Sequence, residues 1–418
     1  MGTTDAHPAI GIYVGHGASH SWTWFADIFE RRGYYNVSFL SESDIFNNAL
    51  DLCDVFFVSG GDTFSIAQGL GKRGAERIER FVANGGMYLG SCAGAYLPLK
   101  SSLSPLNMFN FVHARITNLT KNLPEPKRGE EKFCTEYGCQ YVFHPVREDV
   151  LVKLTGTKRD EDRRITAPLY GGPGILPSQD IDVLAVYDDF TDKTEFLVDE
   201  NIARDTIIGY VAAAKKQYGK GTFYLFGPHF EHPDYEEANR YLLNIMLKRH
   251  ENNTGKAGDL FQKSTMCKNP AAKGLYRSFL SEISNARIVA LALERTSYTW
   301  LIGKKVYDPE KIRVFIEAIW NRARRADMQK GCSSIAEENM TALLQFAGAI
   351  NRDLRQLKRY AGTPQQADTS ATELFGNLRE ATAMFLSLYF KIKRDCLTDD
   401  ERRVTCTYTL KQPQCSIR

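Results

Sequence analysis

The sequence lacks the features that would direct a chain to a membrane, to secretion or to nucleic acid. No apolar run approaches the length of a membrane span. Residues 1–8 do not show the basic and then apolar pattern of a signal peptide. The formal net charge of +3 is too small to indicate a nucleic-acid or membrane-surface partner. We therefore expect a cytoplasmic protein with neither kind of partner.

The cysteines also lack a regular framework. There are nine, an odd number, scattered along the chain, which predicts free thiols in a reducing compartment. Cys134 and Cys139, with His113 and His144 nearby, could suggest zinc, but the pair has poor ligand spacing and no clear second pair. We predict ordinary loop or core cysteines, no metal site and no cofactor.

What is present is typical of a two-domain globular protein. The chain has 418 residues, too many for one ordinary domain, with 43% hydrophobic and 25% charged residues. The first part alternates apolar strands with helices, which predicts a doubly wound parallel sheet with Ser19 as the first helix N-cap. Later strands follow at a spacing typical of hairpins. The predicted strands are 9–14, 36–40, 54–58, 87–90, 164–170, 183–187, 195–198, 207–213 and 222–226, and the helices 20–32, 63–70, 75–83 and 234–248.

The second part has a helical pattern. We predict an α/β domain over 1–250, a polar linker over 251–268, a helical domain over 269–396 and a polar tail over 397–418. The predicted helices are 270–301, 309–326, 334–360 and 370–395. Apolar stripes such as Leu291, Leu293, Trp300 and Leu301 predict bundle core. The basic cluster 322–325 is expected at a solvated helix end.

One stretch organises the first domain. An apolar strand runs into Gly90-Ser91-Cys92-Ala93-Gly94, the thiol version of a nucleophile elbow. The glycines suit a tight strand-to-helix turn, and a thiol beside a helix N-terminus is favoured as thiolate. The alternative is a buried core cysteine after a strand.

Two further strand ends supply partners for Cys92. His229 follows the 222–226 strand, and Glu231 lies two residues on, where it can orient an imidazole. Gly60-Gly61 follows the 54–58 strand, so the N–H of Gly61, with that of Ala93, is a candidate oxyanion donor. His232 is a rival base of lower rank.

These features together resemble class I glutamine amidotransferase-like proteins, and most closely the N-terminal domain family of biotin–protein ligases. The matching pieces are 59–62, 81–96, 170–172 and 227–231. The resemblance implies a flavodoxin-like sheet and a Cys92–His229–Glu231 triad.

The chain departs from this family at one substrate position. Glutamine-using members usually carry Gln four residues after the cysteine, where this chain has Tyr96. No biotin-ligase catalytic domain and no ammonia-accepting synthetase domain is recognisable. We therefore expect a cysteine hydrolase or amidotransferase-like enzyme acting on a small-molecule or peptide-like amide, with Gly60, Gly61, Ala93 and Tyr96 near substrate. The alternative is a non-catalytic binding or regulatory module whose helical half contacts a protein partner.

Overall fold

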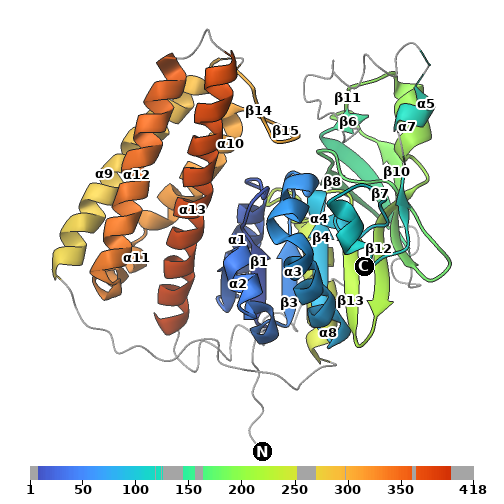
Figure 1. The fold of residues 1–418 in the computed structure, drawn as a ribbon, viewed down its shortest axis with the longest axis horizontal. Helices are drawn as coiled ribbons and strands as arrows, with labels where there is room; N and C mark the ends of the chain where they lie inside the picture. Colours follow the sequence, from blue (N-terminus) through green and yellow to red (C-terminus); the bar gives the residue numbers. More distant parts are fainter. Residues whose placement is uncertain are drawn as a thin grey trace, which may run out of the picture.

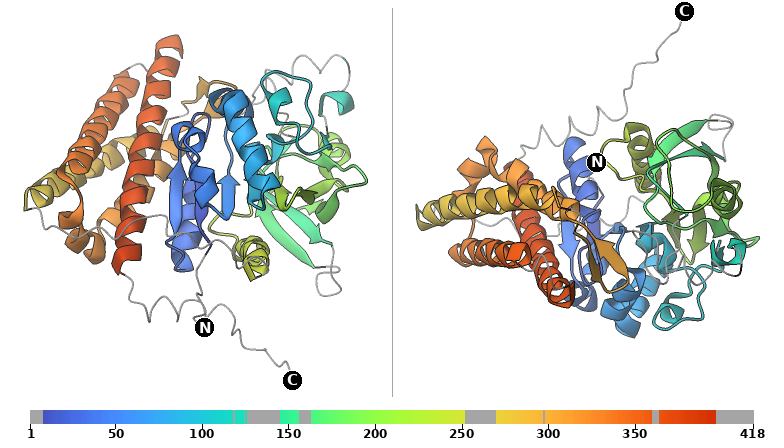
Figure 2. Two further views of the ribbon diagram at one scale, coloured as in Figure 1. Left: turned by 60° about the horizontal axis from the view of Figure 1, so that its bottom comes forward. Right: turned by 90° about the horizontal axis from the view of Figure 1, so that it is seen from above.

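The computed structural model describes residues 8–117, 119–123, 125, 145–155, 163–251, 270–296, 298–359 and 364–396. An α/β domain is followed by a helical bundle, as the sequence predicts (Figure 1). The bundle and the antiparallel strands lie on opposite sides of the parallel strands in every view (Figures 1 and 2). Among the described helices, none is both long and apolar enough to cross a membrane.

The parallel part of the main sheet has the flavodoxin-like strand order. β2 (Val37–Leu40), β1 (Ile10–Tyr13), β3 (Val55–Val58), β4 (Met87–Ser91) and β13 (Gly221–Phe226) are neighbours in that order, and each neighbouring pair is parallel. The order corresponds to 2-1-3-4-5. β1, β3 and β4 are buried at every residue, which explains their continuous apolar runs. The carboxyl ends of β3, β4 and β13 consequently lie together.

The sheet continues from β13 in antiparallel pairs. β12 (Val211–Tyr218), β10 (Asp182–Phe190), β7 (Asp149–Leu154) and β8 (Arg164–Pro168) follow in order, so the predicted hairpins are confirmed. Small strands complete this part: β5 (Arg115–Ile116) with β9 (Ile175–Leu176), and β6 (Val146–Arg147) with β11 (Glu195–Phe196). The prediction was wrong at its 207–213 strand, because 200–207 form helix α7 (Glu200–Ile207) and β12 begins later. Asp199 caps α7 by accepting from the N–H of Asn201.

The other helices of the first domain lie between or after the parallel strands. They are α1 (Trp22–Arg31), α2 (Glu42–Phe46), α3 (Thr63–Ala83), α4 (Ala93–Tyr96), α5 (Leu119–Asn122) and α8 (Glu236–Glu251), with 3₁₀ turns at Ala49–Leu52 and Leu106–Phe109. Gly71 has non-helical dihedral angles and divides α3 where two helices were predicted. Ser19 is not the N-cap of α1, because the helix begins after Ser21 and the Ser19 hydroxyl contacts the His20 ring instead.

The described residues of the second half form long helices and a small hairpin. The helices are α9 (Pro270–Leu293), α10 (Pro309–Ala323), α11 (Ala326–Gly331), α12 (Glu337–Arg359) and α13 (Pro364–Cys396), with a 3₁₀ turn at Cys332–Ser334. The first predicted helix is too long, because β14 (Trp300–Ile302) and β15 (Lys305–Tyr307) form a hairpin after α9. The predicted core stripe is correct for Leu293 and Trp300. It is wrong for Leu291 and Leu301, which are 42% and 50% exposed.

The bundle packs against the first domain through charged and aromatic side chains. Arg322 of α10 is buried and pairs with Asp27 and Glu30 of α1, at 2.6 and 2.7 Å. Phe390 of α13 contacts Phe39 of β2, with ring centroids 5.6 Å apart. The expectation of a solvated end for the whole 322–325 cluster was therefore wrong. The carboxylates that bury Arg322 lie almost 300 residues away in sequence.

Candidate active site

The chain makes a strained turn at Cys92. This residue lies between β4 and α4 with φ 51° and ψ −111°, a backbone conformation that residues other than glycine rarely adopt. A Cβ on Gly94 would collide with the carbonyl oxygen of Val58, and one on Gly90 would collide with the carbonyl oxygen of Gly94. The Cys92 N–H donates to the carbonyl of Phe226, 2.9 Å away, which ties the turn to the end of β13. The elbow geometry is thus the one that the glycine spacing predicts.

His229 and Glu231 lie beside Cys92. The chain turns after β13, and the His229 Nδ1 lies 2.7 Å from Glu231 Oε1. Cys92 and His229 line the same cavity, and each is close enough to the other to shift its pKa. All three side chains are nearly or fully buried, and Cys92 is 6% exposed. The structure therefore brings together the three residues that the sequence singled out.

Two serines that the sequence analysis missed hold Glu231. The hydroxyls of Ser59, after β3, and Ser91, at the end of β4, donate to Glu231 Oε1 at 2.9 and 2.6 Å. The hydroxyl oxygens of Ser59 and Ser21 lie 2.8 Å apart, and because the single proton of Ser59 goes to Glu231, the proton of this second contact comes from Ser21. Ser59 directly precedes Gly60 and Ser91 directly precedes Cys92, so the sequence shows that both serines belong to the two motifs. Their direction toward Glu231 depends on how the three strands are arranged.

Burial and charge have opposite effects on the pKa values of Cys92, His229 and Glu231. Burial raises the pKa of the Cys92 thiol, but the charge and hydrogen bond of His229 outweigh it and bring the pKa below its ordinary value. Burial lowers the pKa of His229, but Glu231 and Cys92 raise it to about 9. Burial raises the pKa of Glu231, and His229 and Ser91 lower it further than burial raises it. These directions favour a thiolate–imidazolium pair with an ionised carboxylate.

The backbone around Cys92 offers donors for a developing oxyanion. Gly61 lines the cavity, and its N–H makes no hydrogen bond within the described part of the chain. Ala93 is the first residue of α4, so its N–H has no partner inside that helix. Tyr96, one turn further on, also lines the cavity.

Gly60 has a different place from the one expected. It does not line the cavity, and its carbonyl accepts from the Ser19 N–H. A Cβ on Gly60 would lie 2.7 Å from His229 Cε1 and 2.8 Å from the Ser21 hydroxyl. Gly60 is required so that the backbone after β3 can approach the imidazole closely.

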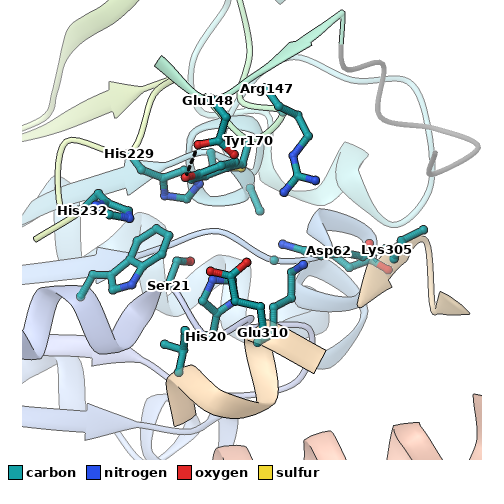
Figure 3. A pocket seen from close by; sticks show the side chains of 18 of the residues that line it. His20, Ser21, Asp62, Arg147, Glu148, Tyr170, His229, His232, Lys305 and Glu310 are labelled. Carbon is teal, nitrogen blue, oxygen red and sulfur yellow. Dashed lines mark hydrogen bonds between the residues drawn. The ribbon is translucent and has the colours of Figure 1, made fainter. Parts of the chain in front are cut away.

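Aromatic side chains enclose the imidazole. The ring of Trp24 stands edge-on to His229 with centroids 5.3 Å apart, and it lies 4.4 Å from the ring of His232. Tyr170 packs 5.7 Å from His229 and donates its hydroxyl to Glu148 (Figure 3). Burial lowers the pKa of His232 to about 4, so its ring is neutral near pH 7. His232 therefore acts as packing beside His229 rather than as a second charged base.

These residues line a cavity of about 360 Å³ that both halves of the chain form. The first domain contributes the side that holds Cys92 and His229, including Trp24, Gly61 and Tyr170. The second half contributes the β14–β15 hairpin and the start of α10, with Lys305, Glu310, Lys311 and Arg313. Figure 3 places Lys305 and Asp62 at one end of the cavity and His232 at the other. The contribution of the second half has no local motif, so the sequence does not show which of its residues line the cavity.

Four residues were weighed as zinc ligands in the sequence: Cys134, Cys139, His113 and His144. Cys134, Cys139 and His144 lie outside the described residues, and His113 is exposed. In the described ranges, no three His, Cys, Asp or Glu side chains gather in a way that could hold a metal ion.

A family model described as biotin-protein ligase, N terminal, matches residues 9–102. The match confirms the resemblance over this part of the chain, which contains Gly60, Gly61 and Cys92. It ends before His229 and Glu231. No curated protein matches the chain.

Solved structures similar to this chain are only distant. A putative GMP synthase subunit from Thermoplasma acidophilum is 15% identical, covers 60% of this chain and 100% of its own, and has a TM-score of 0.37. A glutamine amidotransferase from Thermotoga maritima is 11% identical over 60% of this chain and 86% of its own, with a TM-score of 0.33. A β-galactosidase from Bacillus circulans is 14% identical over 60% of this chain, with a TM-score of 0.35, and this chain spans only 32% of its length. At these TM-scores the likenesses support no conclusion about function.

Proposed function

We propose that this protein is a cysteine hydrolase, or an amidotransferase-like enzyme, that cleaves an amide or peptide-like bond. The observation that carries the proposal is that the Cys92 thiol shares a cavity with the His229 imidazole, whose Nδ1 lies 2.7 Å from the buried Glu231 carboxylate. A histidine that contacts both a thiol and an orienting carboxylate is the arrangement that activates a nucleophile. A reactive thiolate also suits a reducing compartment such as the cytoplasm, because it must stay reduced.

The proposed reaction has two steps. The Cys92 thiolate attacks the amide carbonyl carbon, and the N–H groups of Gly61 and Ala93 stabilise the oxyanion that forms. His229 gives its proton to the leaving amine as the C–N bond breaks, which leaves a thioester on Cys92. Water then attacks the thioester while His229 removes its proton, and the acid leaves as the thiol is restored.

Labelling with an electrophilic peptide-like amide probe tests this function. We expect the probe to modify Cys92 faster than any of the other eight cysteines, because its pKa is lowered while burial raises that of Cys53 to about 12. His229→Ala is expected to slow labelling of Cys92. Glu231→Gln is expected to slow it less, because Glu231 acts on the imidazole and not on the thiol. Cys53→Ala is the control and leaves the rate unchanged.

The double variant makes the test sharper. Glu231→Gln combined with His229→Ala is expected to label no more slowly than His229→Ala alone, because residues that act as a unit are not additive. Labelling of Cys92 that is insensitive to His229→Ala would overturn the proposal. It would favour the alternative of a binding module that keeps the elbow, for which Tyr96 in the glutamine-binding position is the motivating observation.

A further inference from the structure

A lysine from the helical half faces the proposed nucleophile. Lys305 is the first residue of β15, and its side chain lines the same cavity as Cys92 and His229. The charges of Lys305 and Cys92 are close enough to shift each other's pKa. Lys305 is therefore a cation placed where a bound substrate would lie.

The hairpin that carries Lys305 is fixed to the first domain. The N–H of Lys304 donates to Asp62 Oδ2 at 2.7 Å, and the same carboxylate caps α3 through the N–H groups of Phe64 and Ser65. Gly303, with φ 62°, approaches so closely that a Cβ would lie 2.5 Å from Asp62 Oδ2. The turn thus locks onto the strand end that supplies Gly61, and this contact fixes the position of Lys305.

Lys311 and Arg313, which also line the cavity, each pair with a carboxylate, whereas Lys305 has no such ion pair within the described ranges. Lys311 pairs with Asp308, and Arg313 pairs with Glu294 at 2.6 Å. Within the described ranges, no carboxylate lies within ion-pair distance of the Lys305 ammonium, and its nearest ring, that of Tyr307, has its centroid 5.9 Å away. Burial lowers the pKa of Lys305 to about 8, so it is largely protonated at pH 7. A half-buried ammonium without a carboxylate partner is a binding point for an anion.

We infer that Lys305 is a specificity-determining residue that binds an anionic oxygen group, a carboxylate or a phosphate, on the amide substrate of Cys92. The helical half therefore completes the substrate site. This role rests on the proposed nucleophilic role of Cys92, because the anion is recognised as part of the molecule that the thiolate attacks.

Two alkylating reagents of similar size separate the two roles. Iodoacetate carries a carboxylate and iodoacetamide is neutral. In both reactions the Cys92 sulfur forms a bond to the methylene carbon while iodide leaves. We would measure the rate constant of each at pH 7 in the full chain and compare their ratio between variants. Effects on the thiolate change both rates together, whereas recognition of the anion changes only the ratio.

The wild-type chain is expected to favour iodoacetate over iodoacetamide relative to a free thiol. Lys305→Gln is expected to lower the ratio by about fivefold or more, since one charge is removed near the reacting group. Lys305→Arg is expected to retain it. Lys72→Gln is the control and should keep the ratio, because that ammonium is exposed and does not line the cavity. Protection of Cys92 from iodoacetamide by acetate or by inorganic phosphate then tells which anion the site prefers.

The outcomes distinguish this role from the proposed function. Fast, His229-dependent alkylation with a ratio unchanged in Lys305→Gln would overturn the role of Lys305 and leave the nucleophile in place. Equal slowing of both reagents would also overturn it, because Lys305 would then act only on the thiolate. A Cys92 that resists both reagents in the wild-type chain would overturn the two together.

Discussion

Cys92 and His229 are both buried, and each opposes the pKa shift that burial causes in the other. Burial alone would keep the thiol and the imidazole neutral. Their contact, supported by the Glu231 carboxylate, instead favours the charged form of both. Because Glu231 receives hydrogen bonds from Ser59 and Ser91, its charge is held in a fixed position.

The pH dependence of Cys92 follows from these shifts. The thiolate forms below the ordinary thiol pKa, so the iodoacetamide rate should rise and reach a plateau at a lower pH than for a free cysteine. In His229→Ala, burial still raises the pKa of Cys92 but the imidazole no longer lowers it. The midpoint of the pH–rate curve should therefore move above the ordinary thiol pKa. Each unit of that rise lowers the thiolate fraction at pH 7 about tenfold. Rates measured from pH 5 to about 10 would show both midpoints, and equal midpoints would contradict the pairing.

Turnover should fall again at high pH. His229 has to be protonated to release the amine, and its pKa is raised to about 9. As the pH rises through that value the imidazolium is lost, so hydrolysis of an amide should decline while alkylation of the thiolate does not.

The proximity of Cys92, His229 and Glu231 could be predicted from the sequence because local chain geometry fixes it. Cys92 follows one strand and His229 another, and the carboxyl ends of parallel strands share an edge. Lys305 could not be predicted in this way. Its place depends on the contact between the 303–304 turn and Asp62, which are 242 residues apart in the chain.

At the scale of elements, the β4–α4 turn depends on glycine. Gly94 allows α4 to start directly against the carbonyl of Val58, and no other residue type fits without moving β3 or α4. The strain at Cys92 is tolerated because its N–H is bonded to Phe226 and the flanking glycines leave room.

Gly94→Ala should therefore destabilise the fold by about 3 kcal/mol or more and displace the thiol, because the added methyl group has to push a buried carbonyl aside. Gly376→Ala is the control, since this glycine lies within α13 and a Cβ there meets nothing within 4 Å. It should raise the free energy of unfolding by about 0.5–1 kcal/mol. Urea unfolding of the full chain measures both, and equal effects would contradict the packing argument.

The elements that were predicted wrongly from the sequence are those in which local residue preferences are weak or conflicting. The segment 300–307 is short and comes directly after a stretch with a helical pattern. Its pairing as β14 and β15 is supported by contact with the first domain. Helix α7 lies next to β-branched residues that favour a strand, and the cap at Asp199 determines its start. The continuous apolar runs of β1, β3 and β4 carry no such conflict and were predicted correctly.

At the scale of the molecule, the two halves are joined by a buried ion pair. Arg322 lies between Asp27 and Glu30, and Arg325 and Tyr389 also contact Glu30. Removing one partner of such a group leaves buried charge without compensation.

Arg322→Met should weaken the contact between the halves by roughly 3 kcal/mol, which is about a hundredfold in affinity. We predict that limited proteolysis cuts first in 251–268, because this stretch is polar in sequence. The cut wild-type halves should remain associated in gel filtration, and those of Arg322→Met should separate. Arg324→Met is the control, since Arg324 is exposed and stacks on Trp320. A first cut within 20–90, or separation of the wild-type halves, would contradict this prediction.

The place of the β14–β15 hairpin in the chain also orders events during synthesis. Chains emerge from the ribosome N-terminus first. The elbow is complete once Phe226 has emerged and accepts the Cys92 N–H, but the wall of the cavity has to wait for residues 300–314. The nascent protein thus holds the proposed nucleophile before the wall that completes the proposed substrate site, and in that interval the sulfur is more exposed to oxidants. A shortened chain that ends soon after residue 251 would lack this wall of the cavity permanently.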